Sequence, residues 1–217
     1  MIKAVIFDMD GLIIDSQPYW QDAQLEVLPK VGVTITRQDT IDTTGMRIDH
    51  IVEACYRQSP WKEPSRGEVC RQILDRVTEL VRQHKPAMPG LEHAIAICRQ
   101  LNLRLAIASS SPTRLIDATV DALNLHGVFE TQSSGESLIH AKPHPEVYLN
   151  ACDALGLSPP QCVAFEDSFV GLLAAKAASM KAIIIPESNA ADDKRFVIAD
   201  HQLSSLEELT TELLQTI

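Results

Sequence analysis

The chain has 217 residues, of which 45% are hydrophobic, so it can bury one large core or a core with a smaller inserted unit. Its 19 basic and 29 acidic residues give a net charge of −10. An acidic surface repels nucleic acids and anionic membranes, and a phosphate ligand would need a locally positive pocket. We therefore expect neither a nucleic acid nor a membrane among its partners.

The five cysteines are irregularly spaced and include no CxxC motif, which favours neither a zinc site nor a disulfide framework. Reduced thiols in a cytoplasm are the simplest interpretation. Only four apolar residues lie between Lys3 and Asp8, which is too few for a signal peptide. No apolar run approaches the roughly 20 residues of a membrane span. We expect a cytoplasmic protein.

Short apolar runs and helical patterns alternate along most of the chain. The runs that predict buried strands are residues 4–7, 103–108, 162–165 and 182–185. The patterns that predict helices between the later runs are residues 91–101, 112–123, 145–155 and 171–178. A short run at 198–200 suggests an edge strand, and 205–214 a closing helix. This alternation predicts an α/β fold with a doubly wound, Rossmann-like parallel sheet, in which ligands bind at the carboxyl ends of the strands.

Residues 17–85 interrupt the alternation. They show helical patterns near 18–31, 47–57 and 66–84, and no strand pattern. We therefore predict a Rossmann-like core formed by residues 1–16 and 86–217, with a small helical unit, residues 17–85, inserted after the first strand. The stretch "KPAMPG" at 85–90 has two prolines and a glycine and is a plausible hinge.

Two acids follow the first strand in the stretch "FDMDG". Residues two apart on a strand share a face, so Asp8 and Asp10 can point into one crevice, and Gly11 permits a sharp turn. Burying two carboxylates together costs free energy unless a cation or a reaction needs them. Asp and Gly are also common in ordinary turns, so this stretch alone leaves both interpretations open.

Two other polar stretches precede helical patterns. Ser109, Ser110 and Ser111 follow the second predicted strand. They either cap a helix or hold a phosphate with a hydroxyl and backbone N–H groups. Lys142 lies in "HAKPHP", where prolines stiffen the backbone around it. A loop lysine is usually a solvated charge, and this setting is unusual for one without a role.

Glu166 and Asp167 follow the strand predicted at 162–165. They either begin a helix or supply oxygen ligands to a hard cation such as Mg²⁺. Each polar stretch has an ordinary structural explanation on its own. Their joint position after or beside parallel strands, in this order, favours a shared site.

The motifs "DMDG", "ASS", "KP" and "EDS" together resemble those of the haloacid dehalogenase superfamily of phosphohydrolases. The resemblance covers essentially the whole chain, and the helical insertion is similar to the small cap of that superfamily. It implies a magnesium-dependent enzyme that forms an aspartyl-phosphate.

Carried onto this sequence, the resemblance implies that Asp8 is the nucleophile and Asp10 the general acid and base. Ser109 and Ser110 would bind the transferring phosphoryl group. Lys142 would neutralise the phosphate and orient Asp8. A carboxylate and a phosphate dianion repel each other, so such an attack needs positive charge in the site.

The resemblance also implies a Mg²⁺ site. Asp8, Asp167 and the backbone carbonyl of Asp10 would bind the ion, with Glu166 as a ligand or a supporting group. Met9, between the two acids, would contact the substrate with them.

Other activities of the superfamily stay open to different degrees. A dehalogenase needs no metal, so Asp10 and Asp167 favour phosphate chemistry. The β-phosphoglucomutase pattern has a histidine where this chain has Trp20, which disfavours a mutase. Phosphoglycolate phosphatase has similar motifs and is an alternative. A non-catalytic phosphosugar-binding regulator is disfavoured, since Asp8, Asp10 and Lys142 are intact.

Stretches such as "FDMDGLIIDSQPYW", "TTGMRID" and "KPHPEVYL" resemble a group of phosphatases of enteric bacteria that act on hexitol phosphates and 2-deoxyglucose 6-phosphate. The implied substrate is a hexose or hexitol phosphate, and we expect a monomer. Gln17 stands where that group commonly has Glu and is not counted as catalytic. The cap must select the sugar, because the core motifs bind only the phosphate. Its candidate residues are Trp20, Gly45, Met46, Arg47 and Trp61, and we select Arg47 as the substrate contact.

Overall fold

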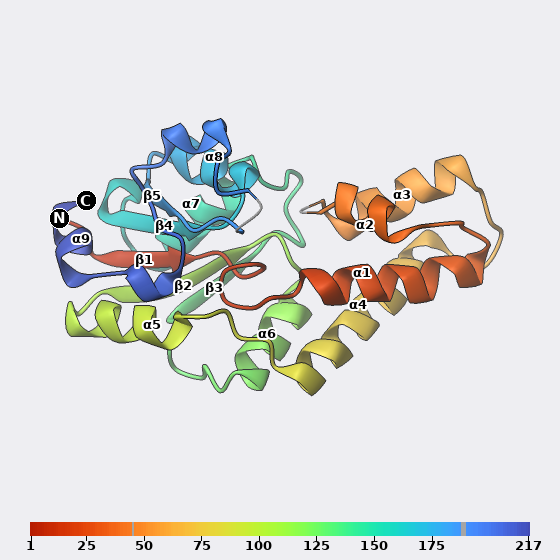
Figure 1. Ribbon diagram of the computed structural model, residues 1–217, viewed down its shortest axis with the longest axis horizontal. Helices are drawn as coiled ribbons and strands as arrows, with labels where there is room; N and C mark the ends of the chain where they lie inside the picture. The colour runs from red at the N-terminus through yellow and green to blue at the C-terminus, as the bar shows by residue number, and fades with distance from the viewer. Residues whose placement is uncertain (45, 188–189) are drawn as a thin grey trace. The chain divides into compact units, whose positions relative to one another are not determined.

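The structure is a computed structural model that describes residues 1–44, 46–187 and 190–217. The chain divides into two compact units. We call Met1–Asp15 with Ala87–Ile217 the core unit, and Ser16–Pro86 the helical unit. Figure 1 shows the strands of the core unit and the helices of both units.

The core unit is built on a six-stranded sheet with the strand order β3-β2-β1-β4-β5-β6. Its strands, all paired in parallel, are β1 (Ala4–Phe7), β2 (Arg104–Ser109), β3 (Thr131–Ser134), β4 (Cys162–Glu166), β5 (Lys181–Ile184) and β6 (His201–Gln202). Strand β1 is central and fully buried, as its apolar sequence predicts. The predicted α/β fold class with a parallel sheet is confirmed.

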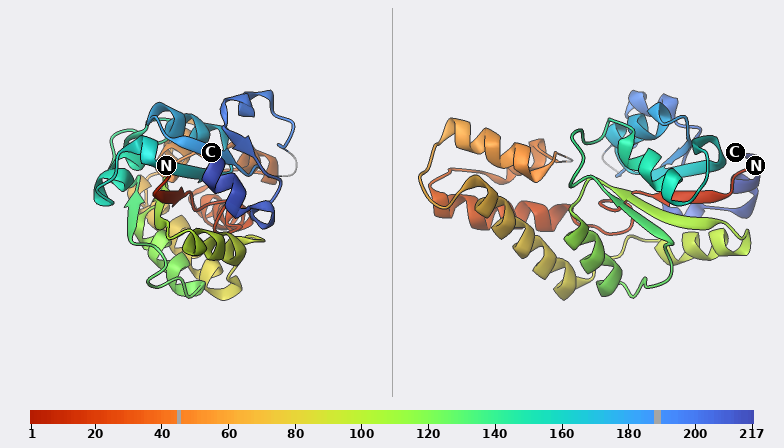
Figure 2. Two further views of the ribbon diagram at one scale, coloured as in Figure 1. Left: turned by 90° about the vertical axis from the view of Figure 1, so that its left-hand side faces the viewer. Right: turned by 180° about the vertical axis from the view of Figure 1, so that it is seen from behind.

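Helices cover both faces of this sheet, as a doubly wound fold requires. The helices of the core unit are α5 (Leu91–Gln100), α6 (Thr113–Ala122), α7 (Glu146–Ala154), α8 (Phe169–Ala177) and α9 (Thr211–Thr216), with 3₁₀ turns η2 (Pro159–Gln161), η3 (Lys194–Ile198) and η4 (Leu206–Glu208). Residues of α7 and α8 share one apolar cluster with the sheet. Figures 1 and 2 show α5 and α6 on the opposite side of the sheet.

The structure of the core unit differs from the sequence predictions at one strand that was missed and at two predicted elements whose bounds are wrong. Strand β3 has the sequence TQSS, which contains no apolar run, and it can be polar because it lies at the sheet edge. The edge strand expected at 198–200 begins later, at His201, because Asp193 caps η3 across 194–198. The helix expected at 205–214 is divided into η4 and α9, since Thr210 starts a new helix by accepting a hydrogen bond from Leu213 N–H.

The helical unit contains no strand among its described residues. Its elements are α1 (Gln17–Val27), η1 (Leu28–Val31), α2 (Arg37–Asp42), α3 (Ile48–Gln58) and α4 (Arg66–His84). Helix α4 packs against α1 and α3 and buries Val69, Ile73 and Val77. The short helix α2 was not predicted because it has no apolar stripe; a capping box between Thr36 and Asp39 starts it.

None of the helices in the described ranges combines the length and the apolar character that crossing a membrane requires.

Candidate active site

The two acids of the loop after β1, Asp8 and Asp10, differ in how far they are buried. The N–H of Asp8 still donates to the carbonyl of Phe165 at 2.9 Å, and the Asp8 side chain is buried. Met9 is fully buried, whereas Asp10 is partly exposed. Gly11 has a φ of 81°, and a Cβ at this position would lie 2.1 Å from Oδ2 of Asp167. The turn therefore needs glycine both for its backbone angle and for the close approach of that carboxylate.

Lys142 connects this loop to the end of β4. Its Nζ donates to Oδ1 of Asp8 and to Oε1 of Glu166, each at 2.6 Å, and to the carbonyl of Ala108 at 3.0 Å. The side chains of Lys142, Asp8 and Glu166 are 5%, 10% and 0% exposed. A buried ammonium is thus held between two carboxylates, and the three groups form one charge network.

Glu166 is fixed through both of its carboxylate oxygens. Oε1 also accepts a hydrogen bond from the Tyr148 hydroxyl at 2.6 Å, while Oε2 accepts one from the Ser168 hydroxyl at 3.1 Å. A Cβ at Gly171 would lie 1.9 Å from Oε1, so this carboxylate packs directly on the backbone of α8. Tyr148 is not among the predicted site residues, although "KPHPEVYL" places it six residues after Lys142, in the first turn of α7.

The pKa values express the cost of this burial. Desolvation raises the pKa of Asp8 to about 7, because the charge of Lys142 only partly opposes it and the charges of Glu166 and Asp10 add to it. Burial acts to lower the pKa of Lys142, but Asp8 and Glu166 outweigh it and leave that pKa above its usual value. Burial raises the pKa of Tyr148 well above 10, so its hydroxyl keeps its proton at neutral pH.

Asp167 belongs to the same cluster. Burial, followed by the charges of Asp8 and Glu166, raises the pKa of Asp167 well above its usual range. One carboxylate oxygen from each of these three residues lies within 4.8 Å of the others. A donor set of carboxylate oxygens with excess negative charge fits a hard divalent cation such as Mg²⁺.

The serines after β2 contact the second acid of the loop. Ser111 donates its hydroxyl hydrogen bond to Oδ2 of Asp10 at 2.6 Å, and the Ser109 hydroxyl lies 3.4 Å from the same oxygen. The N–H of Ser111 donates to Oγ of Ser109 at 3.0 Å. Ser110 lies half-buried at the bend between them. Ser111 is not among the predicted site residues, since nothing in "SSS" indicates which hydroxyl reaches Asp10.

The predicted core residues therefore meet at the carboxyl ends of β1, β2 and β4, together with the loop that carries Lys142.

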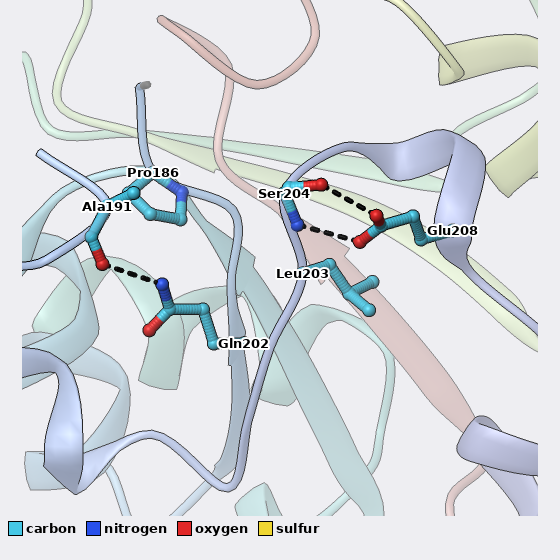
Figure 3. A pocket seen from close by; sticks show the side chains of 6 residues that line it. All are labelled: Pro186, Ala191, Gln202, Leu203, Ser204 and Glu208. Carbon is cyan, nitrogen blue, oxygen red and sulfur yellow. Dashed lines mark hydrogen bonds between the residues drawn. The ribbon is translucent and has the colours of Figure 1, made fainter. Parts of the chain in front are cut away.

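A separate hollow of about 540 Å³ lies in the core unit, beside β6 (Figure 3). Its lining residues are Pro186, Ala191, Gln202, Leu203, Ser204 and Glu208. The amide of Gln202 donates to the Ala191 carbonyl, and Ser204 donates twice to Glu208. These polar groups are satisfied within the protein.

The candidate substrate contacts of the helical unit are distributed over several elements. Arg47 precedes α3 and forms a two-pronged ion pair with Asp49, at 2.8 and 2.5 Å. Met46 is 49% exposed. Trp20 is half-buried on α1, and Trp61 donates its indole N–H to the Pro64 carbonyl at 2.8 Å. Gly45 lies outside the described residues.

Acids, hydroxyls and an ammonium thus gather at the carboxyl ends of a parallel, Rossmann-like sheet, which is where proteins of this fold class bind their ligands. Residues 2–179 match the family of haloacid dehalogenase-like hydrolases. The chain belongs to this family, and the resemblance found in its motifs is confirmed.

The similar proteins specify the class further. The chain is 44% identical over 212 residues to Hexitol phosphatase B of Escherichia coli strain K12, covering 97% of this chain and 96% of that protein. It is 27% identical over 181 residues to the fructose-1-phosphate phosphatase YqaB of the same organism, covering 82% of this chain and 94% of that protein. The chain is accordingly a phosphatase, which confirms the predicted enzyme class.

Solved structures agree with this assignment. CbbY from Rhodobacter sphaeroides in complex with phosphate superimposes with a TM-score of 0.87 at 26% identity, covering 96% of each chain. A CbbY mutant was solved with xylulose-(1,5)bisphosphate, and it has a TM-score of 0.86, again at 26% identity and 96% coverage of each chain. The β-phosphoglucomutase of Clostridium difficile matches with a TM-score of 0.85 at 22% identity, covering 100% of this chain and 96% of that one, which shows a shared fold.

Proposed function

We propose that this phosphatase hydrolyses hexose and hexitol phosphates, such as 2-deoxyglucose 6-phosphate, through an aspartyl-phosphate on Asp8. The observation that carries the chemistry is the Lys142 ammonium held 2.6 Å from Asp8. The similarity to Hexitol phosphatase B, at 44% identity over nearly the whole chain, supports the substrate class.

The residues divide the reaction into two steps. Asp8 attacks phosphorus, while the Lys142 charge offsets the repulsion between the carboxylate and the phosphate. Asp10 protonates the leaving alcohol and then takes a proton from the attacking water. Its carboxylate is oriented by Ser111, at 2.6 Å. The hydroxyl of Ser109 and the backbone of Ser110 hold the phosphoryl oxygens.

We assign a Mg²⁺ site to the carboxylates of Asp8 and Asp167 and the backbone carbonyl of Asp10. The ion, when bound, supplies Lewis-acid stabilisation of the phosphoryl oxygens. The oxygens of Glu166 already accept hydrogen bonds from Lys142, Tyr148 and Ser168, which favours a supporting role for this acid over direct binding.

The helical unit is proposed to act as the cap that selects the sugar and closes over the substrate. Arg47 is the preferred contact, because its guanidinium can donate to sugar hydroxyls. The proposed hinge is formed by Pro86, Pro89 and Gly90, which lie where the chain returns to the core unit. Substitutions at these three positions should alter turnover, and unchanged kinetics in all three would contradict a hinge there.

A phosphate-release assay tests the function. We expect hexose and hexitol 6-phosphates to be the best substrates in a panel that also includes pentose phosphates, phosphoglycolate and nucleotides. EDTA should abolish turnover and added Mg²⁺ should restore it. A preference for phosphoglycolate, or conversion of β-glucose 1-phosphate in the presence of a bisphosphate primer, would replace the proposal by one of its alternatives.

The Asp8→Asn variant separates an enzyme from a binding protein. It removes the nucleophile at almost constant volume, so we expect phosphate release to fall by roughly 10³-fold or more while the fold is retained. The matched control is Asp22→Asn, which changes an exposed acid of α1 that pairs with Arg37. Phosphate release by Asp8→Asn at the wild-type rate would refute the aspartyl-phosphate.

We further propose that the enzyme is monomeric and cytoplasmic. The acidic surface and the irregular cysteine spacing support this proposal. Light scattering on the purified chain and fractionation of expressing cells would test the two parts separately.

A further inference from the structure

Tyr148 is a polar aromatic residue in an otherwise apolar part of the core. Its side chain is fully buried and belongs to the cluster between the sheet and helices α7 and α8. Burying a hydroxyl is unfavourable unless it forms a hydrogen bond, and phenylalanine would fill the same space without that cost. The hydroxyl is therefore informative, and its partner is Glu166, at 2.6 Å.

A count of donors shows what this hydrogen bond does. The Lys142 ammonium has three N–H groups, and it lies within 3.0 Å of three acceptors, on Asp8, Glu166 and Ala108, while the Tyr148 oxygen is a more distant acceptor at 3.4 Å. The single proton of Tyr148 goes to the same oxygen of Glu166 that Lys142 contacts. Two donors consequently share one oxygen of a carboxylate that is fully buried.

This sharing affects the charge balance around the lysine. Asp8 and Glu166 are both 2.6 Å from the ammonium, so they compete for the same positive charge. A hydrogen bond from Tyr148 offsets part of the negative charge on Glu166. Without it, Glu166 would attract Lys142 more strongly, and the lysine would stabilise Asp8 and an incoming phosphoryl group less well.

The ring of the tyrosine adds a second contact to the same group. The Lys142 ammonium lies 4.8 Å from the centre of the Tyr148 ring, within range of a cation–π interaction. The ring and the hydroxyl thus restrict the lysine from one side, and they can be separated experimentally. Phenylalanine retains the ring contact and loses only the hydroxyl.

We propose that Tyr148 is a positioning residue for the phosphoryl-transfer reaction: its hydroxyl holds Glu166 so that the Lys142 ammonium stays directed at Asp8. This inference rests on the proposed function of the site. It assigns to Tyr148 an effect on turnover through Lys142 rather than any contact with the substrate.

The first test compares Tyr148→Phe with a control that loses a buried hydroxyl elsewhere. Thr119→Val is matched, because Thr119 is fully buried on α6 and its hydroxyl donates to the Leu115 carbonyl at 2.9 Å. We expect Tyr148→Phe to lower kcat about tenfold with KM changed less than about twofold. Both variants should lower the melting temperature to a similar extent, because each loses one buried hydroxyl, but Thr119→Val should leave kcat unchanged.

The second test asks whether the effect passes through Glu166. In a double-mutant cycle, Tyr148→Phe should lower kcat about tenfold in the wild-type background and less than about twofold in a Glu166→Gln background. A role in packing alone would give the same factor in both backgrounds. Equal factors would overturn the proposal.

A third variant covers the case in which Tyr148→Phe does not fold. 4-Fluorophenylalanine at position 148 retains the ring and fills the space of the hydroxyl but cannot donate, so it should lower kcat as Phe does. 4-Aminophenylalanine can donate and should restore at least half of the wild-type kcat. Wild-type kcat in the fluoro variant, or in Tyr148→Phe, would overturn the inference. An inactive wild-type enzyme would instead refute the proposed function.

Discussion

The ion pairs at the site of the core unit and those of the helical unit differ in how far they are buried. In the core unit, Lys142, Asp8 and Glu166 form ion pairs while almost completely buried. The helical unit has ion pairs between much more exposed side chains, as in the pair between Arg37 and Asp22, which are 51% and 49% exposed. Exposed pairs add little to stability, whereas a buried network costs desolvation free energy. That cost is typical of a functional site.

The largest effect is expected when the buried network loses its cation. Lys142→Met retains a long, unbranched side chain, one atom shorter than lysine, but leaves Asp8 and Glu166 buried beside each other without a positive charge. We expect the free energy of unfolding to fall by about 3–5 kcal/mol and phosphatase activity to be lost. Chemical denaturation and a phosphate-release assay measure the two effects.

A matched change in the helical unit is the control for this comparison. Arg37→Met removes a cation whose partner Asp22 is about half exposed. It should leave both the denaturation midpoint and the activity close to wild type. Equal losses of stability in the two variants would contradict the contrast between the units.

Mg²⁺ should stabilise the core unit in a pH-dependent way. Burial raises the pKa of Asp8 to about 7, so the folded, ion-free protein binds a proton more tightly than the unfolded chain. This contribution is fully present below the usual pKa of about 4 and is lost as the pH rises through 7. The ion binds the deprotonated carboxylate, so its stabilising effect should grow over the same interval.

Melting curves at pH 5.5 and pH 8 check this prediction. We expect saturating Mg²⁺ to raise the melting temperature by several degrees at pH 8 and less at pH 5.5. The Asp167→Asn variant should lose most of the increase at pH 8. An increase that is independent of pH, or that survives in Asp167→Asn, would contradict a cation site at these carboxylates.

The core unit was also the easier of the two to predict from sequence. Strand β1 is continuously apolar because both faces of a central parallel strand are buried, and the acids that follow it stand out by contrast. The same contrast applies after β4. Because β1 and β4 are parallel, their carboxyl ends lie at the same end of the sheet, and the residues at these ends, Asp8 and Glu166, are brought together there.

The parts that were missed depend on contacts that no local pattern encodes. Tyr148 lies on the buried face of α7, where an aromatic residue normally indicates packing; its role depends on Glu166, 18 residues further along the chain. Ser111 is one of three consecutive serines, and only the turn after β2 directs its hydroxyl to Asp10. Helix α2 is set by a capping box rather than by an apolar stripe, so a search for periodicity does not find it.

Asp200 sharpens the comparison, because it is a structural acid in the core unit. It accepts hydrogen bonds from Lys176 at 2.6 Å, from Lys181 at 3.0 Å and from the N–H of Ala182 at 2.9 Å, and it is 17% exposed. Burial acts to raise its pKa, but these donors outweigh burial and leave the pKa below its usual value. Its contribution to stability is therefore present above pH 4 and lost as the pH falls through the lowered value.

Asp200→Asn should cost about 1–2 kcal/mol of unfolding free energy at pH 7 without changing kcat, since the charged acceptor of these hydrogen bonds is removed. Denaturation at pH 7, 4 and 3.5 should show the difference from wild type shrinking below pH 4. A constant difference across this range would show that the charge of Asp200 is not responsible.

The smallest effect is expected at the surface of the helical unit. Arg76 on α4 forms ion pairs with two acids, Glu26 on α1 at 2.7 Å and Glu79 at 2.8 Å, and so makes a small surface network. All three side chains are at least 32% exposed, so water and salt already screen their charges. Arg76→Gln preserves helix propensity and should shift the melting temperature by less than about 2 °C, with the same result at low and high salt. A larger fall in melting temperature that disappears at high salt would show that the packing of α1 on α4 depends on this bridge. The contrast between a buried ion-pair network in the core unit and weakly stabilising exposed pairs in the helical unit would then be wrong.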